Sequence, residues 1–219
     1  MCTLARVTTS SVRQRRTQQT RQRICDAAKE LFLAEGYAAS TITEIATAAG
    51  VAHQTVYFAF GSKAGVLSAI VDTEVVGDAD AVPLLDRRHV RRIKQIADPH
   101  KRLEHIVAAT CDITQRVAPL YELVRSSAAD SEVGDVLDRH EDQRWQTMRA
   151  FADMLDGELV SDMGVDEAAE RLYALLSHEV HWLLVHRRGW SRARWRRYVV
   201  NEAARQLLPP RDEISVSGR

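Results

Sequence analysis

The sequence predicts an all-α protein, with a small N-terminal three-helix domain followed by a larger helical bundle. Three observations predict this fold. Apolar residues recur at helical spacing through most of the chain, capping signals separate the segments, and no segment alternates apolar and polar residues as a strand does. The 219 residues, 45% of them hydrophobic, suffice for one large domain or two small ones without stabilising disulfides.

The first part of the chain carries an excess of positive charge, although the net charge of the whole chain is zero. Residues 1–65 hold eight lysines and arginines against four aspartates and glutamates. We expect residues 1–16 to form a flexible basic arm. A short arginine run is also typical of a solvated tail, so the segment that follows it decides the interpretation.

Residues 17–65 are predicted to form three helices. Apolar residues at i, i+3, i+4, i+7 and i+8 mark the first helix, from Thr17 to Glu35. Thr41 and Glu44 have the spacing of a capping box, which opens a second helix that Gly50 closes. The third, short helix spans His53–Ala59, with polar side chains on its outer side.

The packing residues of this segment favour a helix-turn-helix. Two closely packed helices need a small residue in the first helix, a glycine at the turn and an apolar anchor in the second. Ala46, Gly50 and Val56 supply these three residues. The alternative is three short helices of some other bundle.

The rest of the chain is predicted to be a helical bundle over residues 66–208, followed by a polar tail over residues 209–219. Ser62 is a good N-cap for a fourth helix, which we expect to run to about Val76 and to bridge the two parts. A connector with one short helix follows. The later helices are predicted at Lys101–Val117, Leu120–Ala129, Glu132–Leu155, Asp166–His186 and Arg192–Leu208.

The stretch Gly50-Val-Ala-His-Gln-Thr-Val-Tyr-Phe-Ala-Phe-Gly-Ser-Lys resembles the signature of the TetR family of transcription regulators. Ala-Glu-Gly-Tyr at the end of the first helix is also similar to that family. The resemblance implies that His53 and Gln54 face base edges in the major groove, and that Thr55, Tyr57 and Lys63 hold DNA phosphates. Ala52 and Ala59 depart from the family pattern, so a phosphate contact is not expected at either.

Three further residues are candidates for the same DNA interface. Thr41 stands at a helix N-terminus, where free backbone amides suit a phosphate. Arg16 and Arg21 precede or open the first helix, where basic side chains follow the minor groove or the phosphates. The neighbouring Arg13, Arg15 and Arg23 share this expectation.

The resemblance also implies a dimer and a small-molecule effector. One recognition helix covers only a few base pairs, so such modules bind as dimers, here through the last two helices. The turn His186-Arg-Arg-Gly-Trp-Ser resembles the one between these helices in many actinobacterial-type members. We expect a largely hydrophobic effector, since few charges fall among the apolar stripes. The candidate pocket residues are Cys111, Tyr121, Trp145, Met148, Phe151, His178 and Trp182.

Other classes of protein fit the sequence less well. His178 and His181 are spaced i, i+3, whereas a zinc-protease helix needs i, i+4, so we expect no metal, no cofactor and no enzyme. The three cysteines form no CxxC pair, and no segment has the apolar length of a secretory signal or a membrane helix. The sequence therefore predicts a cytoplasmic, ligand-responsive repressor that binds palindromic operator DNA as a dimer. The alternative is a helical protein-interaction scaffold.

Overall fold

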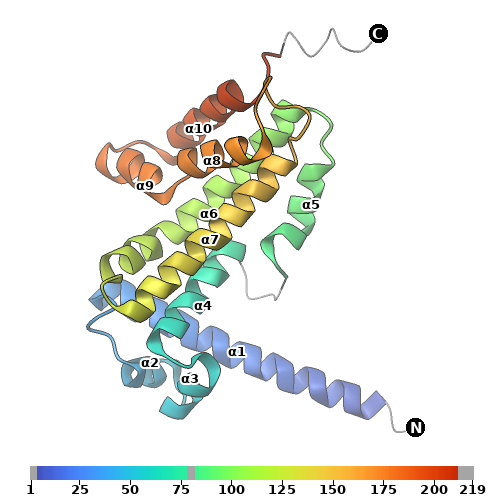
Figure 1. Ribbon diagram of the computed structural model, residues 1–219. Helices are drawn as coiled ribbons and strands as arrows, with labels where there is room; N and C mark the ends of the chain where they lie inside the picture. Colours follow the sequence, from blue (N-terminus) through green and yellow to red (C-terminus); the bar gives the residue numbers. More distant parts are fainter. Residues whose placement is uncertain (1–3, 78–81, 212–219) are drawn as a thin grey trace. The chain divides into compact units, whose positions relative to one another are not determined.

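The computed structural model describes residues 4–77 and 82–211, and the side chains from residue 13 onward. Within those residues the chain is helical and contains no strand, as the sequence predicts (Figure 1). It divides into two compact units. One consists of Met1–Asp80 and Pro119–Leu137, and the other of Ala81–Ala118 and Asp138–Arg219.

The first unit is built on a long helix. Its complete helices are α1 (Leu4–Glu35), α2 (Ile42–Ala49), α3 (His53–Phe60) and α4 (Lys63–Val76). The side chains of Ile24, Ala28 and Phe32 on α1 are fully buried, which confirms the predicted apolar stripe. Helices α2 and α4 both pack against α1, and α3 packs against α2 (Figure 1).

Helix α1 begins much earlier than the sequence predicted. The arm expected at residues 1–16 is helical from Leu4 onward, and residues 1–3 lie outside the described part. The physical reason is that no glycine or proline interrupts residues 4–35, and that arginine and glutamine are good helix formers. The helix ends as predicted, at Gly36, whose φ of +87° and hydrogen bond to the Phe32 carbonyl oxygen stop it.

The first unit extends beyond the boundary predicted at residue 65. All of α4 belongs to it, since α4 packs against α1 and its Val66, Leu67 and Ile70 are buried. The end of α6 (Pro99–Ser127) and the start of α7 (Ser131–Asp153) belong to it as well.

The second unit contains the rest of α6 and α7 together with the C-terminal helices. Its other elements are a 3-10 turn η1 (Leu84–Asp86), α5 (Arg88–Lys94), α8 (Val165–Leu175), α9 (His178–His181), the π-helical segment η2 (Trp182–Arg187) and α10 (Arg192–Leu207). Leu103, Phe151, Leu172 and Trp195 are among the largest side chains of its core, and each is at most 1% exposed. The core therefore joins α6, α7, α8 and α10.

Two helix predictions were wrong in this part of the chain. Pro119 does not divide α6, since proline removes a single backbone donor and the flanking Val117 and Leu120 are buried. Conversely, the helix expected over Asp166–His186 breaks after α8. The Ser177 hydroxyl accepts a hydrogen bond from the Val180 amide at 3.1 Å and caps a new helix, α9.

The C-terminal turn agrees with the sequence. Gly189 has a φ of +67°, and the Ser191 hydroxyl caps α10 by accepting from the Arg194 amide.

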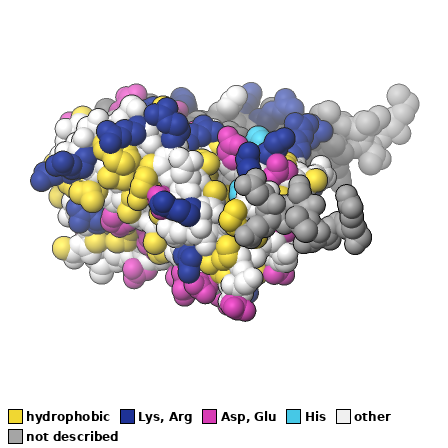
Figure 2. Space-filling view, turned by 90° about the horizontal axis from the view of Figure 1, so that it is seen from above, with side chains coloured by type: hydrophobic (Ala, Val, Ile, Leu, Met, Phe, Trp, Pro, Cys, Tyr) yellow, Lys and Arg dark blue, Asp and Glu magenta, His cyan; other side chains and the backbone are white. Residues whose placement is uncertain are grey.

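In the view from above, exposed hydrophobic side chains are interspersed with lysines and arginines (Figure 2). Within residues 4–77 and 82–211, none of the helices has both the length and the apolar character required to cross a membrane.

Candidate nucleic-acid interface

Helix α2 is fixed at its start by the predicted capping box. The Thr41 hydroxyl accepts from the Glu44 amide, and a Glu44 carboxylate oxygen accepts from the Thr41 amide at 2.8 Å. The Thr41 hydroxyl also donates to the Glu44 carboxylate at 2.7 Å, and this hydrogen bond, followed by the one from the Thr41 amide, lowers the pKa of Glu44. Thr41 was predicted to contact a phosphate through backbone amides, but both its amide and its hydroxyl are engaged within the cap.

The turn between α2 and α3 has the geometry of a helix-turn-helix. Gly50 has a φ of +63°, in the left-handed region, and its amide donates to carbonyl oxygens of the last turn of α2. Ala46 and Val56, the predicted packing residues, are 3% and 0% exposed. The close packing of α2 on α3 thus depends on the three residues that the sequence indicated.

Helix α3 presents a mixed polar and aromatic surface. His53 and Gln54 are exposed, Thr55 is half-buried, and the ring of Tyr57 lies 5.0 Å from that of His53. Phe58 is 90% exposed, whereas the sequence had indicated no role for it. The predicted base-reading and phosphate-binding residues of α3 therefore lie on one short, accessible helix.

Lys63 is held inside the first unit. Its ammonium group donates to the Tyr37 carbonyl oxygen at 2.7 Å and to the Ser40 carbonyl oxygen at 2.9 Å. It also lies 4.1 Å from the centre of the Tyr37 ring. Two of its three N–H donors therefore join the loop after α1 to the start of α4. The sequence had indicated only a phosphate contact for Lys63 and not these contacts within the chain.

Gly65 in the first turn of α4 permits the same junction to close. A Cβ atom at this position would overlap the carbonyl oxygen of Phe60, at the end of α3. The Ser62 hydroxyl caps α4 by accepting from the Gly65 amide at 3.1 Å. The end of α3 and the start of α4 thus lie too close together for a side chain at residue 65.

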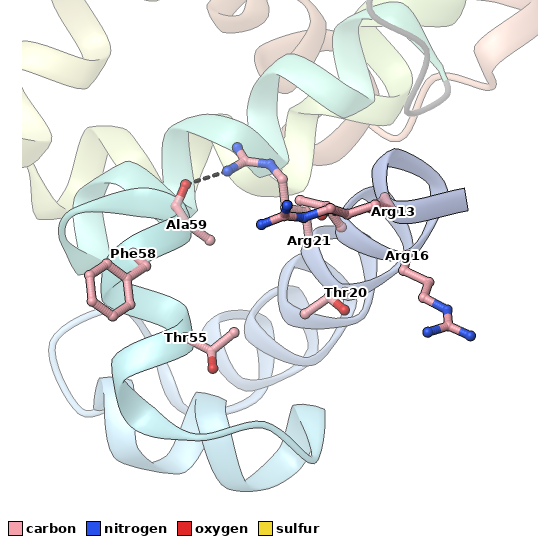
Figure 3. Close-up of a pocket in the computed structure, with 8 residues that line it drawn as sticks. Arg13, Arg16, Thr20, Arg21, Thr55, Phe58 and Ala59 are labelled. Atoms are coloured by element: carbon pink, nitrogen blue, oxygen red, sulfur yellow. Dashed lines mark hydrogen bonds between the residues drawn. The ribbon is translucent and has the colours of Figure 1, made fainter. Parts of the chain in front are cut away.

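Arg21 connects α1 to α3. Its guanidinium donates to the Ala59 carbonyl oxygen and lies 4.2 Å from the centre of the Phe60 ring (Figure 3). Ala59 is the position where the family pattern has a larger residue. Its small side chain lines the cavity into which Arg21 reaches.

A cavity of about 370 Å³ lies between α1 and α3 (Figure 3). Three arginines, three threonines, a phenylalanine and an alanine line it: Arg13, Arg16, Thr17, Thr20, Arg21, Thr55, Phe58 and Ala59. The sequence indicated Arg13, Arg16, Arg21 and Thr55 as candidates, but it did not indicate Thr17, Thr20 or Phe58. The missed signal is spacing, because residues 13, 16, 17, 20 and 21 share one face of a helix once α1 is known to begin at Leu4.

The predicted effector residues are not all brought together. Cys111, Met148 and Phe151 pack in the core of the second unit, and Trp145 lies against that core. His178 is 8% exposed, and burial lowers its pKa to about 3. Of the other two, Trp182 is 37% exposed, and Tyr121 belongs to the first unit rather than the second.

A polar cluster that the sequence did not indicate lies beside these core residues. Arg144 donates to Glu141 at 3.0 Å and stacks on the Tyr173 ring, 3.7 Å from its centre. The Tyr173 hydroxyl donates to the same carboxylate, and its ring is 5.8 Å from that of Trp145. Among the described residues, no three His, Cys, Asp or Glu side chains are grouped as a metal site requires.

The helix-turn-helix residues match a known family model. Residues 24–70 match the model described as bacterial regulatory proteins, tetR family. These residues cover most of the buried part of α1, all of α2 and α3, and the first half of α4.

Three relatives extend this match. The HTH-type transcriptional regulator SrpR of Pseudomonas putida is 34% identical over 96 residues, 37% of this chain, but the match spans only 45% of SrpR. The uncharacterized HTH-type transcriptional regulator TtgW, also of Pseudomonas putida, is 35% identical over 95 residues, 36% of this chain and 71% of TtgW. The HTH-type transcriptional repressor BepR of Brucella suis is 26% identical over 167 residues, which span 72% of this chain and 77% of BepR.

Solved structures agree on the fold. The crystal structure of a transcriptional regulator from Saccharomonospora viridis, in complex with choline, superposes with a TM-score of 0.64. It is 22% identical, and the superposition covers 88% of this chain and 99% of the other. With the family model matched over the helix-turn-helix and TtgW matched over most of its length, this chain belongs to the TetR family of bacterial regulatory proteins.

Proposed function

We propose that this chain is a cytoplasmic transcriptional repressor, which binds palindromic operator DNA as a homodimer and is released by a small-molecule effector. One observation carries the proposal: α3 exposes His53, Gln54 and Tyr57 on a helix held by the Ala46, Gly50 and Val56 packing. Relatives named as transcriptional regulators, and one named as a repressor, support it.

DNA binding assigns different tasks to the exposed side chains of α3. Gln54 carries an amide that pairs with adenine through two hydrogen bonds, so it discriminates between bases. Tyr57 and Thr55 carry hydroxyls that suit phosphates, which set the register of the helix without reading sequence. The protein-interaction scaffold assigns no such difference to these residues.

Selection of bound duplexes from a random pool tests the proposal. A repressor should enrich a palindrome whose half-sites are about one helical turn apart. In fluorescence anisotropy, Tyr57→Ala should then weaken binding to operator and scrambled duplexes alike, whereas Gln54→Ala should change the preferred base at one position of each half-site. A pool without enrichment would favour the scaffold.

Dimerisation is proposed to use η2 and α10. In the single chain, Trp182, Leu183 and Tyr198 are 37%, 52% and 36% exposed, and buried apolar surface of this kind stabilises dimers. We expect Leu183→Asp to give a monomer in analytical ultracentrifugation. Leu85→Asp, at another exposed leucine of the same unit, is the matched control and should leave the dimer intact.

The effector is proposed to bind in the second unit beside Cys111, Met148 and Phe151. Arg144 and Glu141 pair with each other there, so they offer no net charge to a ligand. This pairing and the apolar core favour a largely hydrophobic, uncharged effector. Isothermal titration with matched apolar and charged compounds tests it, and tighter binding of a charged compound would refute this part of the proposal.

The effector acts through thermodynamic coupling. It must bind the form that is free of DNA more tightly than the DNA-bound form, typically by about 1–3 kcal/mol in such systems. An effector that binds without changing operator affinity would contradict release by this route.

A further inference from the structure

Phe58 is the most exposed of the large hydrophobic side chains that the structure describes. It is 90% exposed, whereas Val56, two residues earlier on the same helix, is fully buried. Exposing a phenylalanine to water is unfavourable, because covering its ring with apolar surface lowers the free energy. A partner that covers the Phe58 ring with apolar surface would therefore bind more tightly than one that leaves the ring exposed.

The surroundings of Phe58 restrict what that partner is. The ring lines the cavity between α1 and α3 together with Arg13, Arg16, Thr20 and Thr55 (Figure 3). The occupant must therefore present negative charge to the arginines and an apolar group to the ring within the same small volume. Phe58 also lies on the same face of α3 as Gln54, the predicted base-reading residue, because it follows Gln54 by four residues.

The major groove of DNA presents both features. Phosphates line its edge, and each thymine projects a C5-methyl group into it, the one apolar group by which its base pairs are recognised. Phenylalanine is among the side chains that contact this methyl group. Charge and shape thus agree on double-stranded DNA that carries a thymine beside the adjacent backbone.

We propose that Phe58 is a specificity-determining residue that packs against the C5-methyl group of one thymine in each half-site. Arg13 and Arg16 hold the neighbouring phosphates and fix the approach of the ring. This inference rests on the proposed DNA-binding function and deepens it.

Removal of a single methyl group from the DNA tests the inference. Each thymine of the selected operator is replaced in turn by deoxyuridine, which keeps every hydrogen-bonding group. For the unmodified protein, deoxyuridine at one of these positions should weaken binding by about fourfold when it replaces the thymine of one half-site, and by about fifteenfold when it replaces the thymines of both. This is the effect of one buried methyl group per half-site. Phe58→Ala should bind the thymine and deoxyuridine duplexes with equal affinity, and Phe58→Leu should retain part of the difference.

Two controls separate the roles of the residues. Leu33→Ala removes another exposed apolar side chain of the first unit and should leave the methyl effect unchanged. Arg16→Gln should lower the slope of log affinity against log salt by about 0.9 for each phosphate released, again without changing the methyl effect.

The outcomes are distinct. A selected operator on which deoxyuridine affects the unmodified protein and Phe58→Ala equally at every position would overturn the role of Phe58 while leaving DNA binding intact. A pool that yields no operator would overturn both proposals. Circular dichroism of Phe58→Ala and Phe58→Leu verifies that each variant is folded before its affinity is compared.

Discussion

Replacement of Lys63 by methionine separates its contacts within the chain from any contact with DNA. Methionine keeps much of the length of the side chain and removes the ammonium group. That group donates to the Tyr37 and Ser40 carbonyl oxygens and lies over the Tyr37 ring, 4.1 Å from its centre. We therefore expect the variant to lose stability in the absence of DNA.

The magnitude follows from these contacts. A hydrogen bond from a charged donor contributes about 1.5–3 kcal/mol when buried, and about 1 kcal/mol at this half-buried position after screening by solvent. The cation–π contact adds about 0.5–1 kcal/mol. Two hydrogen bonds and one ring contact give a loss of about 2–3 kcal/mol in the free energy of unfolding of the first unit.

The assay must report on the first unit. All four tryptophans, at positions 145, 182, 190 and 195, lie in the second unit, so their fluorescence does not follow the unfolding of the first. Hydrogen exchange of the α2 and α3 amides, measured by mass spectrometry, reports the stability of the first unit directly.

Lys29→Met is the matched control. It removes the same charge from the same unit, but its ion pair with Glu74 is partly exposed, with 34% and 20% of the two side chains accessible, and such pairs contribute at most about 1 kcal/mol. Equal losses in the two variants would refute the structural role of Lys63. A lower salt slope of DNA affinity in Lys63→Met alone would show that its third donor reaches a phosphate.

Three further predictions concern stability and reactivity. Burial, and then the charges of neighbouring basic groups, lower the pKa of His181 from 6.5 to about 4. Between these two pH values the unfolded chain binds a proton at His181 and the folded chain does not, so protonation favours unfolding. Stability of the second unit should be complete above about pH 6.5 and fall toward about pH 4, as followed by tryptophan fluorescence in urea. His181 accounts for up to about 3 kcal/mol of this fall, and buried His178, whose pKa is lowered to about 3, adds a further loss. Gly65→Ala should cost about 1–3 kcal/mol and weaken DNA binding, because its new methyl group displaces the end of α3; hydrogen exchange and anisotropy measure the two effects. Burial raises the pKa of Cys25 to about 11 and that of Cys111 to about 12, so iodoacetamide near about pH 8 should leave both unlabelled in peptide maps until urea unfolds the chain.

Each of these predictions has a control or an opposing result. His181→Phe should remove the His181 share of this fall and leave the share of His178, whereas His105→Phe, at an exposed position of the same unit, should leave the profile unchanged. A profile that His181→Phe leaves unchanged would contradict the assignment. Gly164→Ala is the control, because a Cβ at residue 164 meets open space, and it should leave stability unchanged. If Gly65→Ala were as stable as Gly164→Ala, the close packing at residue 65 would be refuted. Rapid labelling of the folded chain at either cysteine would contradict its burial.

Most helix ends of the first unit follow from the sequence. The capping box at Thr41, the left-handed glycine at residue 50 and the serine cap at residue 62 all lie where their spacing predicts. Each depends on hydrogen bonds between groups three or four residues apart, and such local spacings can be recognised in the sequence. The helical conformation within residues 1–16 was missed because their polar side chains lack an apolar stripe, although nothing in them breaks a helix.

The candidate site was less predictable. The sequence placed most of the predicted DNA contacts on α3, but it assigned Phe58 no role and treated Lys63 and Arg21 as free to contact DNA. In the folded chain, Lys63 binds carbonyl groups 23 and 26 residues away, and Arg21 binds one 38 residues away. Such partners are specified only when distant segments pack together.

The sequence by itself thus determined the helical class, the helix-turn-helix and its caps, because these depend on periodicity and on contacts within four residues. Only the tertiary structure decided which cations are held within the protein and which line the cavity between α1 and α3. The physical reason is that a side chain's partner depends on which residues of another helix face it, and the packing of whole helices sets that arrangement.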